Sequence, residues 1–184
     1  MAVLRSLVAA AVMAAAAAMT CPSSESWVHA GCQNTAQTPA TCEEVMAEMK
    51  ARVSAEGGWT DPHNGGTYSV LSSNAYELRT QRTTNPVKSH GGKVYTDKQI
   101  FTLTDMGARG CLIEGCSESQ KFSVNDFSTN YCNIRNLYCG KEDGCTPVKH
   151  DLKSMQVKTK LSIGAGKEWS VCVVGPQAAA GVYQ

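Results

Sequence analysis

The chain has 184 residues, nine cysteines and a formal net charge of +1, from 17 Lys and Arg against 16 Asp and Glu. A nearly neutral chain has no long-range field that attracts nucleic acid or an anionic membrane, so we expect no nucleic acid among its partners. Its length suits a single domain.

Residues 1–18 have the features of an export signal. The stretch 4–18 is apolar and rich in alanine, contains one basic residue, Arg5, and ends in the small-x-small form that signal peptidase accepts. We therefore predict a cleaved signal peptide and a secreted or luminal mature chain. No run of 18 apolar residues follows, so no membrane span is expected in that chain.

All nine cysteines lie beyond this leader, and in an oxidising compartment cysteines usually form disulfides. Four bridges and one unpaired, buried thiol are therefore expected, and no metal or other cofactor. Bridges should stay within each of two groups, for example among Cys132, Cys139 and Cys145, because cysteines close in sequence meet most easily. The groups are Cys21, Cys32 and Cys42, and Cys111, Cys116, Cys132, Cys139, Cys145 and Cys172.

Residues 19–40 are polar and rich in turn formers, which predicts a segment pinned to the body by cysteines. A single α+β domain is expected over 41–175, followed by a flexible tail over 176–184. The domain should begin with an amphipathic helix over 42–55. Thr41 and Glu44 form a capping box there, and apolar residues recur at helical spacing.

The remaining segments favour strands. In 110–117, Cys111 and Cys116 are an odd number of residues apart, so they should point to opposite faces. Either Gly115 forms a bulge, or the two cysteines have different partners. Residues 154–163 alternate apolar and polar side chains, which predicts one buried and one exposed face. The expected strands are 67–72, 76–83, 95–104, 110–117, 131–139, 154–163 and 171–174.

One helix and six or seven strands indicate an α+β fold, with an N-terminal amphipathic helix packed on a curved antiparallel sheet and reinforced by disulfides. A β-sandwich with one helix is the alternative. Cystatin-like and nuclear-transport-factor-like folds are similar to this layout, although not in sequence.

The loop 57–66 is the most distinctive candidate site. It offers Trp59, Asp61, His63 and Asn64 on a glycine-rich frame. Asp61 could orient His63 as a base, or the group could bind a small polar ligand. The same residues are also typical of a loop that joins a helix to a sheet. His150, beside Asp151, is a further weak candidate for catalysis.

Basic residues gather between 79 and 98, where Arg79, Arg82, Lys88 and Lys93 could bind a phosphate or a sulfated glycan. A charged, solvent-exposed sheet edge is the alternative interpretation.

No catalytic or cofactor motif is present. The leading hypothesis is therefore a secreted or luminal, non-enzymatic binding module for a macromolecule or a small ligand. One alternative is a small hydrolase or isomerase-like enzyme that uses Asp61 and His63 in a concave sheet pocket. A cystatin-type protease inhibitor is the other, although the Q-x-V-x-G hairpin of those inhibitors is absent.

Overall fold

The computed structural model describes residues 19–88 and 92–173. The predicted signal peptide and C-terminal tail lie outside the described residues.

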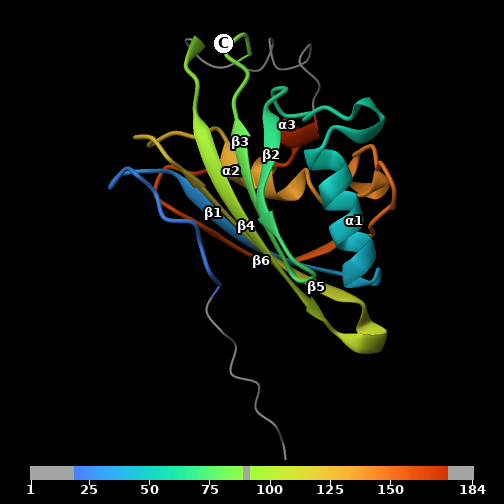
Figure 1. The fold of residues 1–184 in the computed structure, drawn as a ribbon. Coiled ribbons are helices and arrows are strands. Elements are labelled where there is room, and N and C mark those ends of the chain that lie inside the picture. Colours follow the sequence, from blue (N-terminus) through green and yellow to red (C-terminus); the bar gives the residue numbers. More distant parts are fainter. Residues whose placement is uncertain (1–18, 89–91, 174–184) are drawn as a thin grey trace, which may run out of the picture.

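Six strands form one twisted antiparallel sheet in the order β2-β3-β4-β5-β1-β6 (Figure 1). Strands β2 to β5 are neighbours in both sequence and space, as expected for antiparallel strands with short connections. Strand β1, the first of the chain, instead lies between β5 and β6. The strands are β1 (Gly31–Thr38), β2 (Thr67–Ser73), β3 (Glu77–Thr83), β4 (Thr96–Asp105), β5 (Cys111–Ser119) and β6 (Met155–Leu161).

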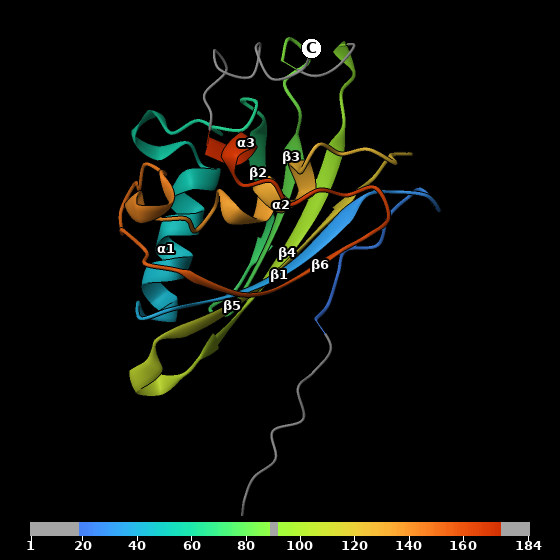
Figure 2. The ribbon, with the colours of Figure 1, turned by 180° about the vertical axis from the view of Figure 1, so that it is seen from behind.

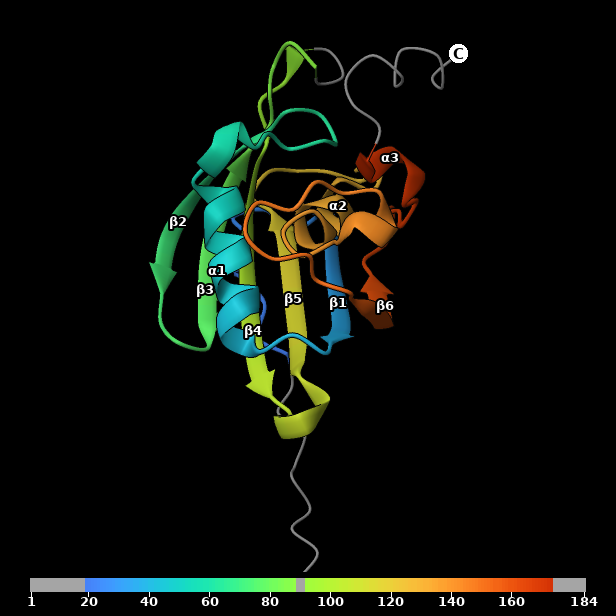
Figure 3. The same cartoon turned by 90° about the vertical axis from the view of Figure 1, so that its right-hand side faces the viewer.

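The helices gather on one face of this sheet (Figures 2 and 3). Helix α1 lies over β2, β4 and β5, and α2 over β1, β4 and β5. The fold is therefore α+β, with a single sheet rather than a sandwich. The helices are α1 (Cys42–Val53), α2 (Thr129–Arg135) and α3 (Ser170–Val173), with short 3-10 helices η1 (Glu56–Gly58), η3 (Gly107–Arg109) and η4 (Lys141–Asp143).

Helix α1 begins at a capping box. The Thr41 hydroxyl accepts a hydrogen bond from the backbone N–H of Glu44, whose carboxylate accepts one from the Thr41 N–H. Its apolar stripe, including Val45 and Met49, is buried against the sheet. The helix ends at Val53, two residues before the predicted end. It is the second element of the fold, because β1 precedes it.

Strand β1 was not predicted, since its residues were assigned to a polar, cysteine-pinned segment. It is an inner strand of the sheet, next to the edge strand β6, and its inward side chains include polar groups that find buried partners. The Tyr138 hydroxyl donates to Asn34 at 2.6 Å, and Asn34 donates to Thr159 at 3.0 Å. Such internal pairing lets polar residues occupy a buried strand without an apolar alternation in the sequence.

Two predicted strands are wrong, because 131–139 contains most of α2 and 171–173 belongs to α3. Helix α2 begins where the Asp126 carboxylate accepts hydrogen bonds from the backbone N–H groups of Ser128 and Asn130. These contacts satisfy N–H groups that a helix start leaves free. The disulfide between Cys132 and Cys172 then joins α2 to α3.

The predicted burial of one face of residues 154–163 is also wrong. Met155 is 66% exposed, Val157 57% and Ile163 94%. Strand β6 lies at the edge of the sheet, beyond the main overlap with the helices, so Met155 and Val157 find little to pack against, whereas Leu161 is partly buried against the core.

Four disulfides connect eight of the nine cysteines, and the remaining one, Cys32, is buried. The bridges Cys21–Cys116 and Cys42–Cys111 cross between the two predicted groups, contrary to expectation. The sheet explains this, because it places the N-terminal part of the chain beside β5, which sequence distance does not reveal. The other two, Cys132–Cys172 and Cys139–Cys145, stay within the second group. Four disulfides indicate an oxidising, non-cytosolic compartment.

Cys111 and Cys116 have different partners on opposite faces of β5, and the register of β5 runs without a bulge at Gly115. The glycine serves close packing instead. A Cβ atom there would lie 2.6 Å from Cγ2 of Ile134, so only glycine lets α2 approach the sheet this closely.

Among the described residues, no helix has both the length and the apolar character needed to cross a lipid bilayer.

Candidate functional site

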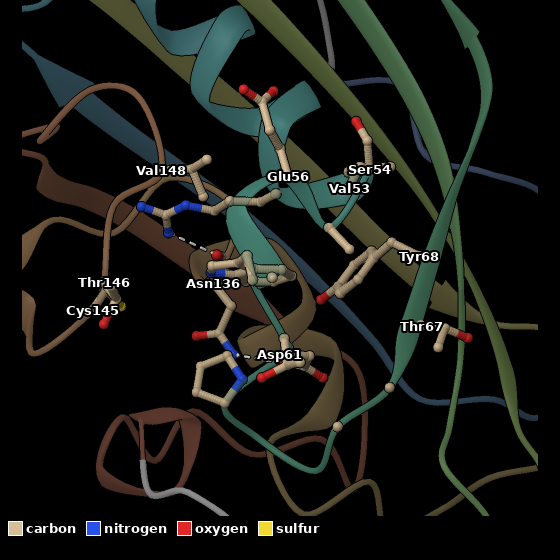
Figure 4. A pocket seen from close by; sticks show the side chains of 18 of the residues that line it. Val53, Ser54, Glu56, Asp61, Thr67, Tyr68, Asn136, Cys145, Thr146 and Val148 are labelled. Carbon is tan, nitrogen blue, oxygen red and sulfur yellow. Dashed lines mark hydrogen bonds between the residues drawn. The ribbon is translucent and has the colours of Figure 1, made fainter.

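A cleft of about 1150 Å³ lies at the β2 edge of the molecule (Figure 4). Its walls are the C-terminal end of α1 with η1, the loop 59–66, the first half of β2, and the loop 144–148. Asn85 and Lys88 complete its border. The most distinctive loop of the sequence therefore forms part of a concave surface.

Asp61 is buried in this cleft and is the centre of a hydrogen-bond network. Its carboxylate accepts from Nε of Arg82 at 2.9 Å and from Nδ2 of Asn136 at 3.0 Å. It also accepts from the backbone N–H of His63 at 3.2 Å. The Arg82 Nη2 group donates to both Asp61 and Asn64. The network joins the loop to β3 and to the residue that follows α2.

Gly66 makes room for this arrangement. A Cβ atom at this position would lie 2.4 Å from Cζ of Arg82, so only glycine lets the loop close over the guanidinium. The Gly65-Gly66 pair was visible in the sequence, but nothing in the sequence identified Arg82 as its neighbour.

Burial alone would raise the pKa of Asp61, but the Arg82 guanidinium, His63 and the hydrogen bonds from Arg82 and Asn136 together hold the pKa below its ordinary value. The same ion pair keeps the pKa of Arg82 above its ordinary value despite burial. Asp61 is thus ionised at neutral pH, and its charge is balanced by Arg82 within the protein. This pair therefore gives a ligand in the cleft neither a proton donor nor an unpaired positive charge.

A second buried ion pair fixes the opposite wall. Glu48 and Arg52, one helical turn apart on α1, are joined at 2.6 Å, and both side chains are fully buried. The Glu48 carboxylate also accepts from three consecutive backbone N–H groups, those of Val148, Lys149 and His150, at 2.6–2.8 Å. Burial raises the pKa of Glu48, but these donors together with Arg52 bring it below its ordinary value.

Two aromatic side chains belong to the cleft. Trp59 and Tyr68 lie with ring centroids 6.1 Å apart, and both rings pack against the hydrophobic core. Tyr68 also has the Arg82 guanidinium 5.8 Å from its ring centroid. Trp59 is only partly buried, so part of its ring faces the cleft.

Asn136 is a cleft residue that the sequence analysis missed. Its amide nitrogen donates to Asp61 and to the Cys172 carbonyl. Its amide oxygen is buried and has no hydrogen-bond partner among the described residues. An amide in the middle of a cysteine-rich segment carries no signal in the sequence, because only the fold brings it beneath loop 59–66.

His63 lies beside the cleft rather than in its lining. Its Nδ1 atom is 2.8 Å from the Val171 carbonyl and its Nε2 atom 3.2 Å from the Thr129 hydroxyl. Burial lowers the pKa of His63, so its ring is neutral at neutral pH. A neutral ring that donates from Nδ1 to the carbonyl and accepts at Nε2 from the hydroxyl matches these contacts. The Asp61 carboxylate accepts from the backbone N–H of His63, whereas the ring of His63 contacts Val171 and Thr129.

His150 is held by its backbone to Glu48, and its ring faces Glu44 of α1 at 3.9 Å. Both of these acids belong to α1. Of the three candidate catalytic residues, Asp61 lines the cleft, whereas His63 and His150 lie outside its lining, and the hydrogen bonds and ion pairs of the three side chains are all with other residues.

The four predicted anion-binding residues do not share one surface. Arg82 is buried with Asp61, whereas Arg79, on the opposite face of β3, forms an exposed ion pair with Glu77 at 2.7 Å. Lys88 lies at the border of the cleft, and the Lys93 carbonyl accepts from Thr84. Among these four side chains, only that of Lys88 borders the cleft.

Two further features bear on chemistry. Burial, with nearby Asp126 and Glu118, raises the pKa of the Cys32 thiol to about 12, so it remains protonated and a poor nucleophile. Cys21, Cys116 and Glu118 are close enough to share a metal ion, but the two cysteines are joined in a disulfide and do not present thiolates.

The chain matches no known protein-family model, and a comparison with curated proteins gives no match.

Proposed function

We propose that this protein is a non-enzymatic, secreted or luminal binding module that holds a neutral, polyhydroxylated ligand, such as a glycan segment, in the cleft beside β2. The observation that carries the proposal is the pairing of the cleft's buried charges with each other. Asp61 is neutralised by Arg82 and Glu48 by Arg52, so these buried groups provide no unpaired charge for a charged ligand.

Recognition would then depend on two kinds of groups. Trp59 offers a partly exposed aromatic face, on which the C–H face of a sugar ring can pack. Thr60 adds a hydroxyl group to the lining.

An enzyme that uses Asp61 and His63 finds less support in the geometry. General acid–base catalysis needs a side chain with a proton to exchange inside the cleft. The carboxylate of Asp61 is committed to Arg82, and both ring nitrogens of His63 already have neighbours within the protein.

Titration calorimetry tests the proposal with neutral hexasaccharides of glucose, mannose and N-acetylglucosamine, and with heparin as a charged probe. We expect at least one neutral probe to bind, and Trp59→Ala to weaken that binding at least tenfold. Trp27→Ala is the matched control, because it removes a tryptophan from a different part of the surface.

Binding of heparin alone would contradict the proposal in favour of an anion site. Failure of all four probes, or equal binding by wild type and Trp59→Ala, would also contradict it. Turnover of a saccharide by the purified protein would replace it with an enzymatic function.

A further inference from the structure

A group of exposed apolar side chains lies at another part of the molecule, away from the lining of the cleft. Trp27 is 102% exposed, Ile163 94%, Phe122 64%, and Val28 and Val124 49% each. We call these five residues the apolar loop tips. They come from three segments that are far apart in the sequence.

Hydrogen bonds hold the three segments together. The Ser123 N–H donates to the Val28 carbonyl at 3.3 Å, and the Ser123 hydroxyl accepts from the Ala30 N–H at 2.9 Å. The Gly31 N–H donates to the Ser162 hydroxyl at 2.8 Å, and the Ser162 N–H donates to the Gly31 carbonyl at 3.0 Å. The first segment therefore binds both of the others.

The second and third segments also touch directly. A Cβ atom on Gly164 would overlap the Val124 carbonyl, and the Gly166 N–H donates to the Asp126 carboxylate at 3.0 Å. Figures 1 and 2 show these blue, gold and orange-red segments together beyond the same end of β1 and β5. These contacts hold the three segments, and with them the apolar loop tips, in fixed positions relative to one another. We call the three bonded segments the platform.

We propose that the apolar loop tips dock this protein on the surface of a lipid bilayer that contains anionic lipid. Trp27 and Ile163 protrude almost completely, so they do not line a groove into which a partner's side chain would fit. A protein partner would need a shaped pocket for each of them, whereas the interfacial region of a bilayer accepts protruding apolar groups of any shape. Tryptophan is also enriched at membrane interfaces.

The backbone polar groups of the three segments are also compatible with contact with a bilayer. The backbone bonds described above satisfy several N–H and C=O groups within the protein, which lowers the cost of contact with a less polar medium. Asp126, two residues after Val124, is buried and accepts from Ser128 and Asn130 as well as Gly166.

Charge at the border favours anionic headgroups. Lys121, Lys160 and Lys167 lie on or beside these segments with exposed side chains. Two exposed acids, Glu25 and Glu168, lie there as well, and Glu25 pairs with Lys98 at 3.6 Å, so the exposed lysines outnumber the exposed acids. Such attraction is short-ranged, so apolar insertion must supply most of the binding.

Vesicle sedimentation tests this with the oxidised, full-length mature protein and two compositions, phosphatidylcholine alone and phosphatidylcholine with 30 mol% phosphatidylserine. We expect sedimentation with the mixed vesicles, accompanied by a blue shift of tryptophan emission. The double variant Trp27→Ala/Ile163→Ser should lose at least fivefold in partitioning, and most of the blue shift. Trp59→Ala is the control and should partition as wild type does.

Three results would overturn the proposal. The first is the absence of sedimentation with either composition. The second is unchanged partitioning of the double variant, which would indicate binding by charge alone. The third is a wild-type oligomer in sedimentation velocity that Trp27→Ala/Ile163→Ser dissociates, with no vesicle binding, since the apolar loop tips would then be a protein–protein interface. Retained far-ultraviolet circular dichroism would show that the variant is folded.

Discussion

The cleft and the apolar loop tips differ in how their side chains are used. In the cleft, Asp61 and Glu48 are buried, and each is neutralised by an arginine and by backbone or amide donors. At the loop tips, Trp27 and Ile163 are almost fully exposed and bury little of their surface. The difference teaches that the buried charged residues at the cleft are committed to contacts within the fold, whereas the exposed side chains of the tips make few such contacts, which is the basis of the proposal that they bind a partner.

The largest expected effect follows from breaking the cleft's central pair. Asp61→Asn removes the carboxylate that is hydrogen-bonded to the buried Arg82 guanidinium, and removing one member of a buried pair costs about 3–5 kcal/mol. Denaturant unfolding should show this loss in the free energy of unfolding. Glu77→Gln, which breaks the exposed pair with Arg79, is the control and should cause no measurable change. Equal stability of Asp61→Asn and wild type would mean that the pair does not support the cleft.

Breaking the Glu48–Arg52 pair in the opposite wall of the cleft should have a more local effect on stability. Glu48→Gln removes the charge that Arg52 and three backbone N–H groups share, and we expect a loss of about 3 kcal/mol. Amide hydrogen exchange of Val148, Lys149 and His150 should accelerate more than that of the β4 and β5 amides. A uniform acceleration would show that the loop 146–150 has no separate dependence on Glu48.

The buried ring of His63 should make the free energy of unfolding depend on pH. Its pKa in the folded protein lies below the ordinary value of 6.5, so below pH 6.5 the unfolded chain binds a proton that the folded protein does not. This contribution to stability is present above pH 6.5 and is lost as the pH falls toward the folded pKa. Wild type should therefore lose stability relative to His63→Gln between pH 7 and pH 5. A constant difference over that range would contradict a neutral, buried ring.

The smallest effect on stability is expected at the loop tips. Ile163→Ser and Trp27→Ala remove side chains that are 94% and 102% exposed, so each should change the free energy of unfolding by less than about 0.5 kcal/mol. Thermal unfolding measures this. A large loss would show that these residues pack in solution and are not available to a partner.

The sequence predicted the elements whose signals are local. The capping box at Thr41 and Glu44 marks the start of α1, and short β-prone runs mark β2 to β5. The elements that depend on residues far away in the sequence were either not predicted, as for β1, or predicted with the wrong secondary structure, as for α2. Strand β1 has buried polar residues such as Asn34, whose partners lie on Tyr138 and Thr159. Helix α2 begins at a carboxylate, Asp126, that precedes it.

The candidate site was predictable only in part. The loop 57–66 was identified by its composition, and it does form part of a cleft. The roles of its residues were not predictable, because they depend on Arg82 and Asn136, which lie 21 and 75 residues from Asp61 in the chain. Arg82 was grouped with surface cations for the same reason. The disulfides between β5 and the N-terminal part of the chain also depend on the sheet order.

Hydrogen–deuterium exchange of the oxidised protein, resolved by peptide, tests the separation of the two surfaces most directly. With a bound neutral hexasaccharide we expect protection in 57–70 and 144–148. With phosphatidylserine-containing vesicles we expect it in 25–30, 121–127 and 162–167. Protection of the same peptides by both probes, or by neither, would contradict the account.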